Sequence, residues 1–273
     1  MSLRAGEPPP PPEPLPADVL DSHCHLDAMG CRDRTDVAAV VAAAQAVGVR
    51  RIVTVGDTVA SSRWCADAAA DHPDVYAAVA VHPNETSDVD DATYSELAEL
   101  ASRTEVRAVG ETGLDYYWQR VELQVQQEAF RRHIDLAKRA GKALVVHDRD
   151  AHQDILRILA EEGAPEWTVF HCFSGDAEMA RLCVERGYIL SFAGTVTFKN
   201  ATALRAAAAV VPVESMLVET DAPFLAPMPY RGRPNAPYLV PLTVRVLADV
   251  LGVHIEQLCE GLAQTGDRVF GPW

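Results

Sequence analysis

Eight short apolar runs, each followed by a longer segment of helical character, constrain the fold of this chain more than any other feature. The runs cover residues 19–22, 51–55, 75–81, 106–109, 143–146, 167–170, 188–192 and 216–218. Their hydrophobicity is continuous rather than alternating, which is typical of strands buried on both faces in a parallel sheet covered by helices. Eight strand-then-helix units in one series predict an α/β fold, a TIM-type (β/α)8 barrel.

The segments between the runs are predicted to be helices, and several of them close with a glycine. They are residues 36–47, 58–71, 91–102, 120–140, 151–162, 176–186 and 200–210, with 239–250 and 254–268 completing the outer layer. An open doubly wound sheet is the alternative. The sequence contains neither GxGxxG nor GxxxxGK[ST], so it lacks the glycine-rich turn expected of a nucleotide-binding sheet.

The amino-terminal segment differs from the rest in composition. Residues 1–18 are rich in proline and are predicted to be a disordered leader, and residues 19–273 are predicted to form one TIM-barrel domain. The leader lacks the apolar centre of a secretion signal, and no apolar run reaches the roughly 18 residues that a membrane span needs. We expect a cytoplasmic protein with no membrane partner and no obligate protein partner.

Charge and cysteine usage narrow the functional classes. The net charge of −15 argues against a protein that coats a polyanion nonspecifically, because such binding needs a dense basic surface. A nucleic-acid substrate stays open if metal ions and a few local arginines meet its phosphates. The six cysteines form no CxxC pair, which indicates free thiols rather than a disulfide framework.

Polar side chains follow six of the eight runs, at the carboxyl ends where barrel enzymes place their chemistry. They are His23 and His25, then His82, then Glu111 and Asp115, then His147, then His171, and last Glu219 and Asp221. One histidine at a strand end is more often structural than a ligand. Imidazoles and carboxylates gathered on one barrel mouth, however, need a cation between them to avoid repulsion or unsatisfied groups. We expect the other histidines, His72, His133, His152 and His254, on the surface.

The donor set indicates the kind of metal site. The predicted ligands are His23, His25, Glu111, His147, His171 and Asp221. Four nitrogen and two carboxylate donors are too many for one tetrahedral zinc, and two divalent ions that share a carboxylate fit better. Glu111, on a middle strand, is the expected bridge. Ligand type suits Zn, Mn, Co or Fe, while Mg prefers oxygen and water, and all five stay open.

The motifs resemble those of the TatD family of metal-dependent deoxyribonucleases, within the amidohydrolase-like barrel hydrolases. The matching segments, in family order, are DSHCHLD (21–27), GETGLDYYW (110–118), VVHDRDA (145–151), FHCFSGD (170–176), ETDAPFLAP (219–227) and RGRPNAPYLV (231–240). The resemblance places the family's metal ligands on the same six residues. The chain departs from the family at HDRDA, where His-Ser-Arg-Glu-Ala is usual, and at Ala236, where the family has a glutamate.

The resemblance implies hydrolysis of phosphodiester bonds in DNA, often exonucleolytic, on single strands or duplex ends. We expect Asp221 to bind metal and accept the proton of the attacking water, and Glu111 to bridge two ions. The expected substrate-binding residues are His82, Tyr116, Arg149, Lys199, Arg231 and Arg233.

Two other functions stay open. The same metals on the same fold hydrolyse amides and esters, such as aminoacyl-tRNA or small molecules, because fold and ligands do not fix the substrate. A barrel that uses a metal only for stability and acts as a binding scaffold is disfavoured, because structural zinc sites are closed and four-coordinate and this set has donors to spare.

Overall fold

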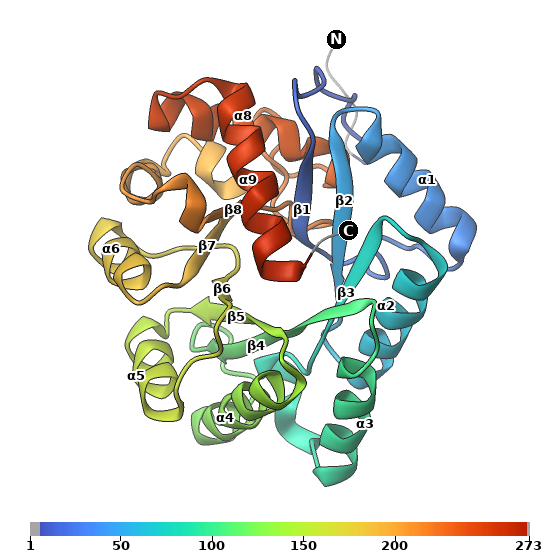
Figure 1. Cartoon of the computed structure of the whole chain (residues 1–273), viewed down its shortest axis with the longest axis vertical. Helices are drawn as coiled ribbons and strands as arrows, with labels where there is room; N and C mark the ends of the chain where they lie inside the picture. Colours follow the sequence, from blue (N-terminus) through green and yellow to red (C-terminus); the bar gives the residue numbers. More distant parts are fainter. Residues whose placement is uncertain (1–5, 272–273) are drawn as a thin grey trace.

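The computed structural model describes residues 6–271, and eight parallel strands form its sheet in the order β1 to β8. The strands stand side by side around a barrel, with the helices outside them (Figure 1). They are β1 (Val19–Cys24), β2 (Val49–Val55), β3 (Val75–Val79), β4 (Val106–Asp115), β5 (Ala143–Arg149), β6 (Thr168–Phe170), β7 (Ile189–Phe192) and β8 (Met216–Val218). The predicted TIM-type barrel is therefore confirmed.

Each predicted helical segment contains a helix. The helices are α1 (Arg34–Gln45), α2 (Val59–Asp71), α3 (Asp91–Ala101), α4 (Leu123–Ala140), α5 (His152–Glu162), α6 (Ala177–Glu185), α7 (Thr202–Ala208), α8 (Val240–Leu251) and α9 (Ile255–Phe270). Short 3-10 helices add η1 (Pro83–Asp88), η2 (Gly194–Thr197), η3 (Val213–Ser215) and η4 (Pro237–Leu239). Side-chain caps fix several starts; the Asp33 carboxylate, for example, accepts the backbone N–H groups of Thr35 and Asp36.

The first and last strands close the barrel at the mouth. The N–H of His25 donates to the carbonyl of Ala222 at 2.8 Å, and the N–H of Asp221 donates to the carbonyl of His23 at 2.9 Å. At the other end α9 crosses the barrel: a Cβ added to Gly266 would lie 2.1 Å from Leu20 Cδ2, so a larger residue at this position would displace the Leu20 side chain of β1.

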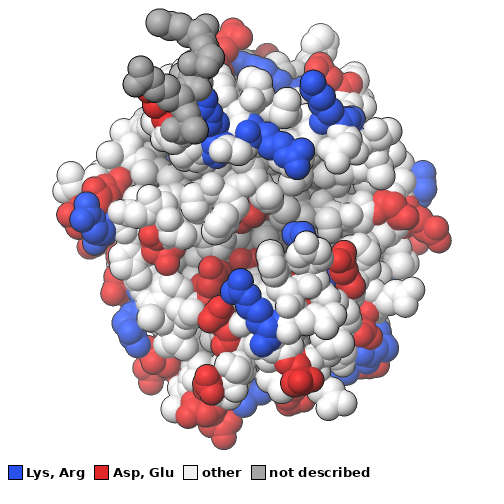
Figure 2. Space-filling view, turned by 180° about the vertical axis from the view of Figure 1, so that it is seen from behind, with Lys and Arg blue, Asp and Glu red and all other residues white. Residues whose placement is uncertain are grey.

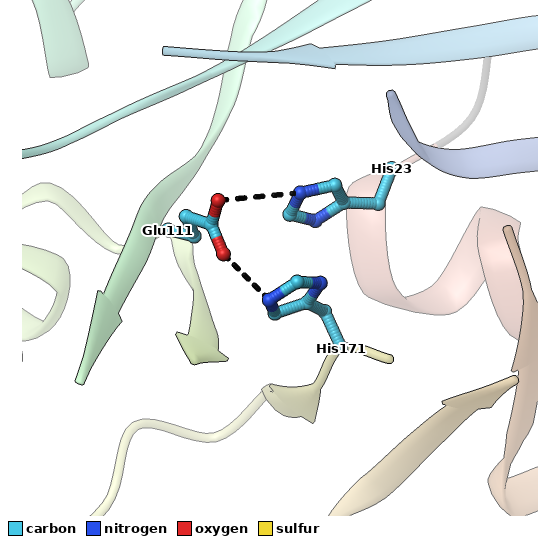
Figure 3. Close-up of side chains that lie close together, drawn as sticks. All are labelled: His23, Glu111 and His171. Carbon is cyan, nitrogen blue, oxygen red and sulfur yellow. Dashed lines mark ion pairs between the residues drawn. The ribbon is translucent and has the colours of Figure 1, made fainter. Parts of the chain in front are cut away.

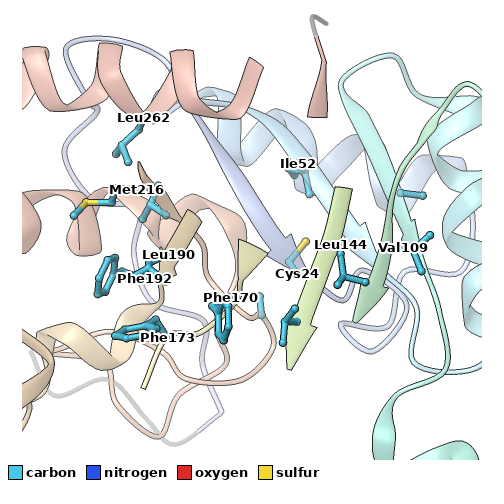
Figure 4. Packing of buried hydrophobic residues seen from close by; sticks show 14 of the residues in the cluster. Cys24, Ile52, Val109, Leu144, Phe170, Phe173, Leu190, Phe192, Met216 and Leu262 are labelled. Atoms are coloured by element: carbon cyan, nitrogen blue, oxygen red, sulfur yellow. The ribbon is translucent and has the colours of Figure 1, made fainter. Parts of the chain in front are cut away.

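The hydrophobic core lies between the strands and the helices. Figure 4 shows side chains of neighbouring strands, such as Leu190 and Met216, packed with Leu262 of α9. All three are fully buried. This continuous apolar layer on the outside of the sheet is what the unbroken apolar runs predict.

Three strands extend beyond the carboxyl ends of the predicted runs. β1 reaches Cys24, β4 reaches Asp115 and β5 reaches Arg149. The polar residues continue the parallel pairing there; Gly113 pairs with His147, for example. Because the mouth of a barrel accepts polar side chains on the inner face, hydrophobicity stops before the strand does.

The prediction of a disordered leader is wrong for residues 6–18. This segment runs along the barrel. The hydroxyl of Tyr238 donates to the carbonyl of Pro9 at 2.6 Å, and the N–H of Leu15 donates to the carbonyl of Val47, between α1 and β2, at 3.0 Å. Prolines restrict the unfolded chain, so ordering an extended segment costs less entropy, and the buried Leu15 anchors it. Residues 1–5 lie outside the described part of the chain.

Across residues 6–271 no single helix is long and apolar enough to cross a membrane. The segments Pro237–Leu251 and Ile255–Phe270 meet the length and composition criteria together, with a bend of 111° between them.

Candidate metal centre

The carboxyl ends of the strands bring the six predicted metal ligands together at one mouth of the barrel. Glu111 of β4 lies between the others and faces two sides. Its Oε1 is 3.8 Å from His23 Nε2 and 3.6 Å from His25 Nε2. Its Oε2 is 3.1 Å from His147 Nδ1 and 2.5 Å from His171 Nε2. Figure 3 shows His23 and His171 directed at the two oxygens of this carboxylate.

The first group of donors collects around Oε1 of Glu111. His23 Nε2 and His25 Nε2 are 3.3 Å apart, and Asp221 Oδ1 lies 3.4 Å from His25 Nε2. Each of these atoms lies within 4.8 Å of the others in the group His23, His25 and Asp221. This group offers two imidazole nitrogens and two carboxylates. Such donors are a typical set of ligands for a divalent cation.

The second group collects around Oε2 of Glu111. His147 Nδ1 and His171 Nε2 are 3.3 Å apart, and both face this oxygen. His171 also forms a group with His23 and Glu111 whose donor atoms lie within 4.8 Å of one another, so the two groups adjoin at Glu111. This position of Glu111 fits the predicted bridge between two ions.

At these residues, burial and neighbouring charges shift the pKa in opposite directions. Burial disfavours the ionised form of Glu111, but His171, His147 and His23 hold its pKa well below the usual range. Burial also disfavours protonated His25, but hydrogen bonding to Asp221 and the charges of Asp57 and Glu111 raise its pKa to about 10. Buried carboxylates that draw protons this strongly onto the neighbouring imidazoles are typical of a site that binds cations.

Contacts behind the ligands orient the rings. His25 Nδ1 is 3.0 Å from the carbonyl of Val55, so it carries the proton and leaves Nε2 free. His147 Nε2 lies 3.3 Å from Asp115 Oδ2, which also accepts from Asn84 Nδ2 at 2.9 Å. The sequence pattern located Asp115 but gave it no role; the structure places it behind His147.

Asp221 is held in a backbone conformation that non-glycine residues seldom adopt, with φ of 56°. The preceding residue, Thr220, donates both its N–H (2.9 Å) and its hydroxyl (2.5 Å) to the buried carboxyl group of Asp21 on β1. Burial raises the pKa of Asp21 to about 8. Asn235 supports the same loop, because its Nδ2 donates to the carbonyls of Thr220 and Phe224.

Asp57, just after β2, is a member of the centre that the sequence pattern missed. Its Oδ1 lies 3.6 Å from His25 Nδ1, and His25, Asp57 and Glu111 form a further group of mutually close donors. Its position directly after the second apolar run was the available signal. The histidines that follow other runs were the stronger signal.

His82 is brought to the centre, as predicted. Its ring lies 4.5 Å from that of His147, and His82, Glu111 and His147 form another group with donor atoms within 4.8 Å. The N–H of Asn84 donates to His82 Nδ1 at 3.1 Å, so the proton of the neutral ring is on Nε2. Burial lowers the pKa of His82 to about 3, which keeps the ring neutral.

Tyr116, a predicted substrate contact, directs its hydroxyl toward two outer helices. Its hydroxyl donates to Asp154 of α5 at 2.7 Å and accepts from Gln127 of α4 at 2.7 Å. Its exposed neighbours Tyr117 and Trp118 are instead available at the rim. Residues 116–118 form a turn after β4, so strand alternation no longer applies and sequence spacing does not fix where each aromatic side chain points.

Of the predicted basic residues, Lys199, Arg231 and Arg233 lie on loops after the strands, and Arg149 is the last residue of β5. Arg149, Lys199 and Arg231 are exposed and Arg233 is partly buried. The guanidinium of Arg149 lies 4.7 Å from the ring of Tyr117, and that of Arg231 lies 4.5 Å from the ring of Phe198. Figure 2 shows the face opposite α9: acidic atoms lie in a central hollow, and Lys and Arg side chains stand around it.

One exposed aromatic residue stands beside the metal ligands. Phe224 is 54% exposed, and its ring lies 6.1 Å from that of His25. It follows Asp221 on the same loop, so a substrate that reaches Asp221 also meets this ring.

The departures from the resembling motif have local explanations. Asp148, in HDRDA, accepts from His152 Nδ1 at 2.8 Å and from the N–H of Ala151, and so supports the start of α5. Ala236 precedes η4 and donates its N–H to the side chain of Asn235. Neither contact involves a predicted metal ligand.

The expectation of four surface histidines is wrong for His133, which is fully buried on α4. Its Nε2 accepts the N–H of Val81 and its Nδ1 donates to the carbonyl of Ala129. His254 is exposed, whereas His72 and His152 are partly buried.

Comparison with known proteins agrees with this arrangement. A family model described as TatD related DNase matches residues 20–271. A protein of Mycobacterium tuberculosis described as uncharacterized metal-dependent hydrolase TatD is 47% identical over 258 residues, which cover 93% of this chain and 98% of that protein. The uncharacterized metal-dependent hydrolase YcfH of Escherichia coli is 39% identical over 257 residues, covering 92% and 95% of the two chains.

Solved structures are similar over nearly the whole fold. The crystal structure of YJJV, a TatD homolog of Escherichia coli, has a TM-score of 0.87 at 27% identity and covers 93% of this chain and 98% of that chain. A hydrolase TatD family protein of Entamoeba histolytica shares the fold, with a TM-score of 0.81 at 17% identity, covering 95% of this chain and all of that chain. The chain belongs to the family of TatD-related DNases, a family of metal-dependent hydrolases.

Proposed function

We propose that this protein is a metal-dependent deoxyribonuclease that hydrolyses phosphodiester bonds of DNA, with cleavage from strand ends. The observation that carries the proposal is the position of Glu111, whose two oxygens each face a separate group of imidazoles. Two adjacent divalent ions suit phosphoryl chemistry, because they hold the attacking and the leaving oxygen of one phosphate.

The fit of the residues to two ions rests on the donors themselves. Around Oε1 of Glu111 lie His23, His25 and Asp221, and around Oε2 lie His147 and His171. When bound, divalent ions at these donors lower the pKa of water toward neutrality and stabilise negative charge on phosphate oxygens. Zn, Mn, Co, Fe and Mg are the candidate ions.

The chain's own residues supply the remaining steps. Asp221, less buried than Glu111, accepts the proton of the attacking water at the open side of the centre. His82, neutral and with its proton on Nε2, donates a hydrogen bond to a phosphate oxygen. Arg149, Lys199 and Arg231 contact phosphates farther along the strand.

The experiment is a digestion of end-labelled single-stranded and duplex oligonucleotides in the presence of Mn²⁺, Mg²⁺ or Zn²⁺, with mapping of the products. Stepwise loss of nucleotides from one end supports the proposal. Intact DNA with every metal, in a preparation that binds these ions, refutes it.

A second candidate keeps the metal centre and changes the substrate to an amide or an ester, such as aminoacyl-tRNA or a small molecule. The net charge of −15 favours a neutral or cationic small molecule as this substrate, because an acidic surface repels polyanions, DNA and aminoacyl-tRNA alike. Turnover of a panel of small amides and esters, without release of nucleotides from DNA, would select this candidate.

A further inference from the structure

A further buried carboxylate, Glu219, lies behind the metal centre and has no role in the chemistry described above. It follows β8 directly and is fully buried. Its Oε1 accepts the N–H of Cys172 at 2.8 Å and lies 3.4 Å from His171 Nδ1. Burying a carboxylate is costly, so its retention here calls for partners that use its charge.

His171 presents its two ring nitrogens to two carboxylates. Nε2 lies 2.5 Å from Glu111 Oε2, and Nδ1 lies 3.4 Å from Glu219 Oε1. A neutral imidazole carries one proton, and the nitrogen without it is the one that binds a cation. A carboxylate at Nδ1 keeps the proton there and leaves the lone pair of Nε2 directed at the centre.

His23 stands in the same relation to the centre. Its ring stacks on that of His171, with 4.0 Å between centroids and 11° between planes. Figure 3 shows one nitrogen of each ring facing Glu111 and the other facing away from it. Among the described residues, three buried atoms here lack a hydrogen-bond partner: Nδ1 of His23 and Nδ1 of His171, which can donate, and Oε2 of Glu219, which can accept.

We propose that Glu219 is a positioning residue that accepts the Nδ1 proton of His171, and with its second oxygen serves the stacked His23, so that Nε2 of each ring binds a divalent ion. This inference rests on the proposed metal centre and concerns the affinity and tautomer of its ligands. Removing such a carboxylate costs about 10- to 100-fold in metal affinity in comparable sites.

The test uses the full-length metal-free protein and Zn²⁺ alone, without nucleic acid. Glu219→Gln keeps the shape and one acceptor and removes the charge, and Glu219→Ala removes both. We expect Zn²⁺ binding, measured by calorimetry, to weaken by about 10-fold in the first variant and more in the second. Glu105→Gln is the matched control, because Glu105 precedes β4 at the opposite end of the barrel and bonds to Arg103. Its Zn²⁺ affinity should equal that of the native protein.

The melting temperature of each metal-free variant separates positioning from structure. A variant of Glu219 that melts like the native protein and binds Zn²⁺ as tightly overturns the inference. A Co²⁺ absorption spectrum shifted in Glu219→Gln and unshifted in Glu105→Gln supports it, because the spectrum reports ligand geometry.

A spectroscopic measurement on the native protein covers the case in which the variants fail to fold. In the Zn²⁺-loaded native protein, ¹⁵N chemical shifts should show His171 protonated at Nδ1 and ligating through Nε2. The opposite tautomer overturns the inference. Absence of Zn²⁺ binding by the native protein would instead refute the metal centre itself, which is a different result.

Discussion

His133 is expected to make the stability of this protein depend on pH. Its imidazole is fully buried between α4 and the end of β3, where Nε2 accepts the N–H of Val81 at 3.2 Å and Nδ1 donates to the carbonyl of Ala129 at 2.7 Å. Burial lowers the pKa of His133 from 6.5 to about 4, so the ring is neutral in the folded protein. Protonation at Nε2 would place a second N–H donor against the N–H of Val81.

The sign and size of the effect follow from the two pKa values. Because the folded pKa lies below the unfolded one, the unfolded chain binds a proton that the folded chain does not, and the free energy of unfolding falls as the pH drops through this window. Between about pH 7.5 and about pH 5 the loss from this residue is about 2 kcal/mol, at about 1.4 kcal/mol per pKa unit.

The assay is urea denaturation of the metal-free protein at these two pH values, in chelator. His133→Gln replaces the ring with a side chain that both accepts and donates but does not titrate. We expect the drop in unfolding free energy to shrink by about 2 kcal/mol in this variant. His254→Gln, at an exposed position, is the matched control and should keep the native pH dependence. If native protein and His133→Gln lose the same stability between the two pH values, the assignment of a neutral buried ring is refuted.

Further perturbations test the centre and its surroundings. His23→Ala and Asp221→Ala should each abolish metal-dependent hydrolysis without changing the circular dichroism spectrum; full turnover in either contradicts the ligand assignment. Calorimetry of the native protein should give about two divalent ions per chain, and no binding would count against the two-ion proposal. Asn235→Ala should lower stability by about 2 kcal/mol and reduce kcat, because it releases the loop that carries Asp221; unchanged values would show that the loop needs no such anchor. Tyr116→Phe should cost about 1 kcal/mol of stability and leave KM for DNA unchanged, and a raised KM would restore Tyr116 as a substrate contact.

Much of the fold was predictable because one signal was repeated. Each buried strand of a parallel barrel needs an apolar run, and each run was followed by a helical segment, so the eight units reinforced one another. The last residues of β4 continue the strand although they no longer form an apolar run. The apolar signal therefore ends before the strand does. The order of residues 6–18 was missed because composition reports the unfolded chain's preference and not the contact of Leu15 with the barrel.

The candidate centre was predictable to the extent that strand ends converge in a barrel. His23, Glu111 and His171 come together from strand ends far apart in sequence, as the topology requires. A role that a residue plays through its neighbour was harder to predict. Asp57 and Glu219 stand at the same ends, but their partners are ring nitrogens whose orientation no spacing rule predicts.

The contact between β1 and β8 has a consequence for synthesis of the protein on the ribosome. Asp21 finds Thr220, and Leu20 finds Gly266, only after nearly the whole chain has been made. Until then β1 has an unpaired edge. Pairing it with β8 closes a loop of nearly the whole chain, and the entropy cost of closing so long a loop makes the pairing slow. A product that stops short of β8 lacks both Asp221 and the strand that shields β1, so such fragments should be inert toward substrate and prone to aggregate.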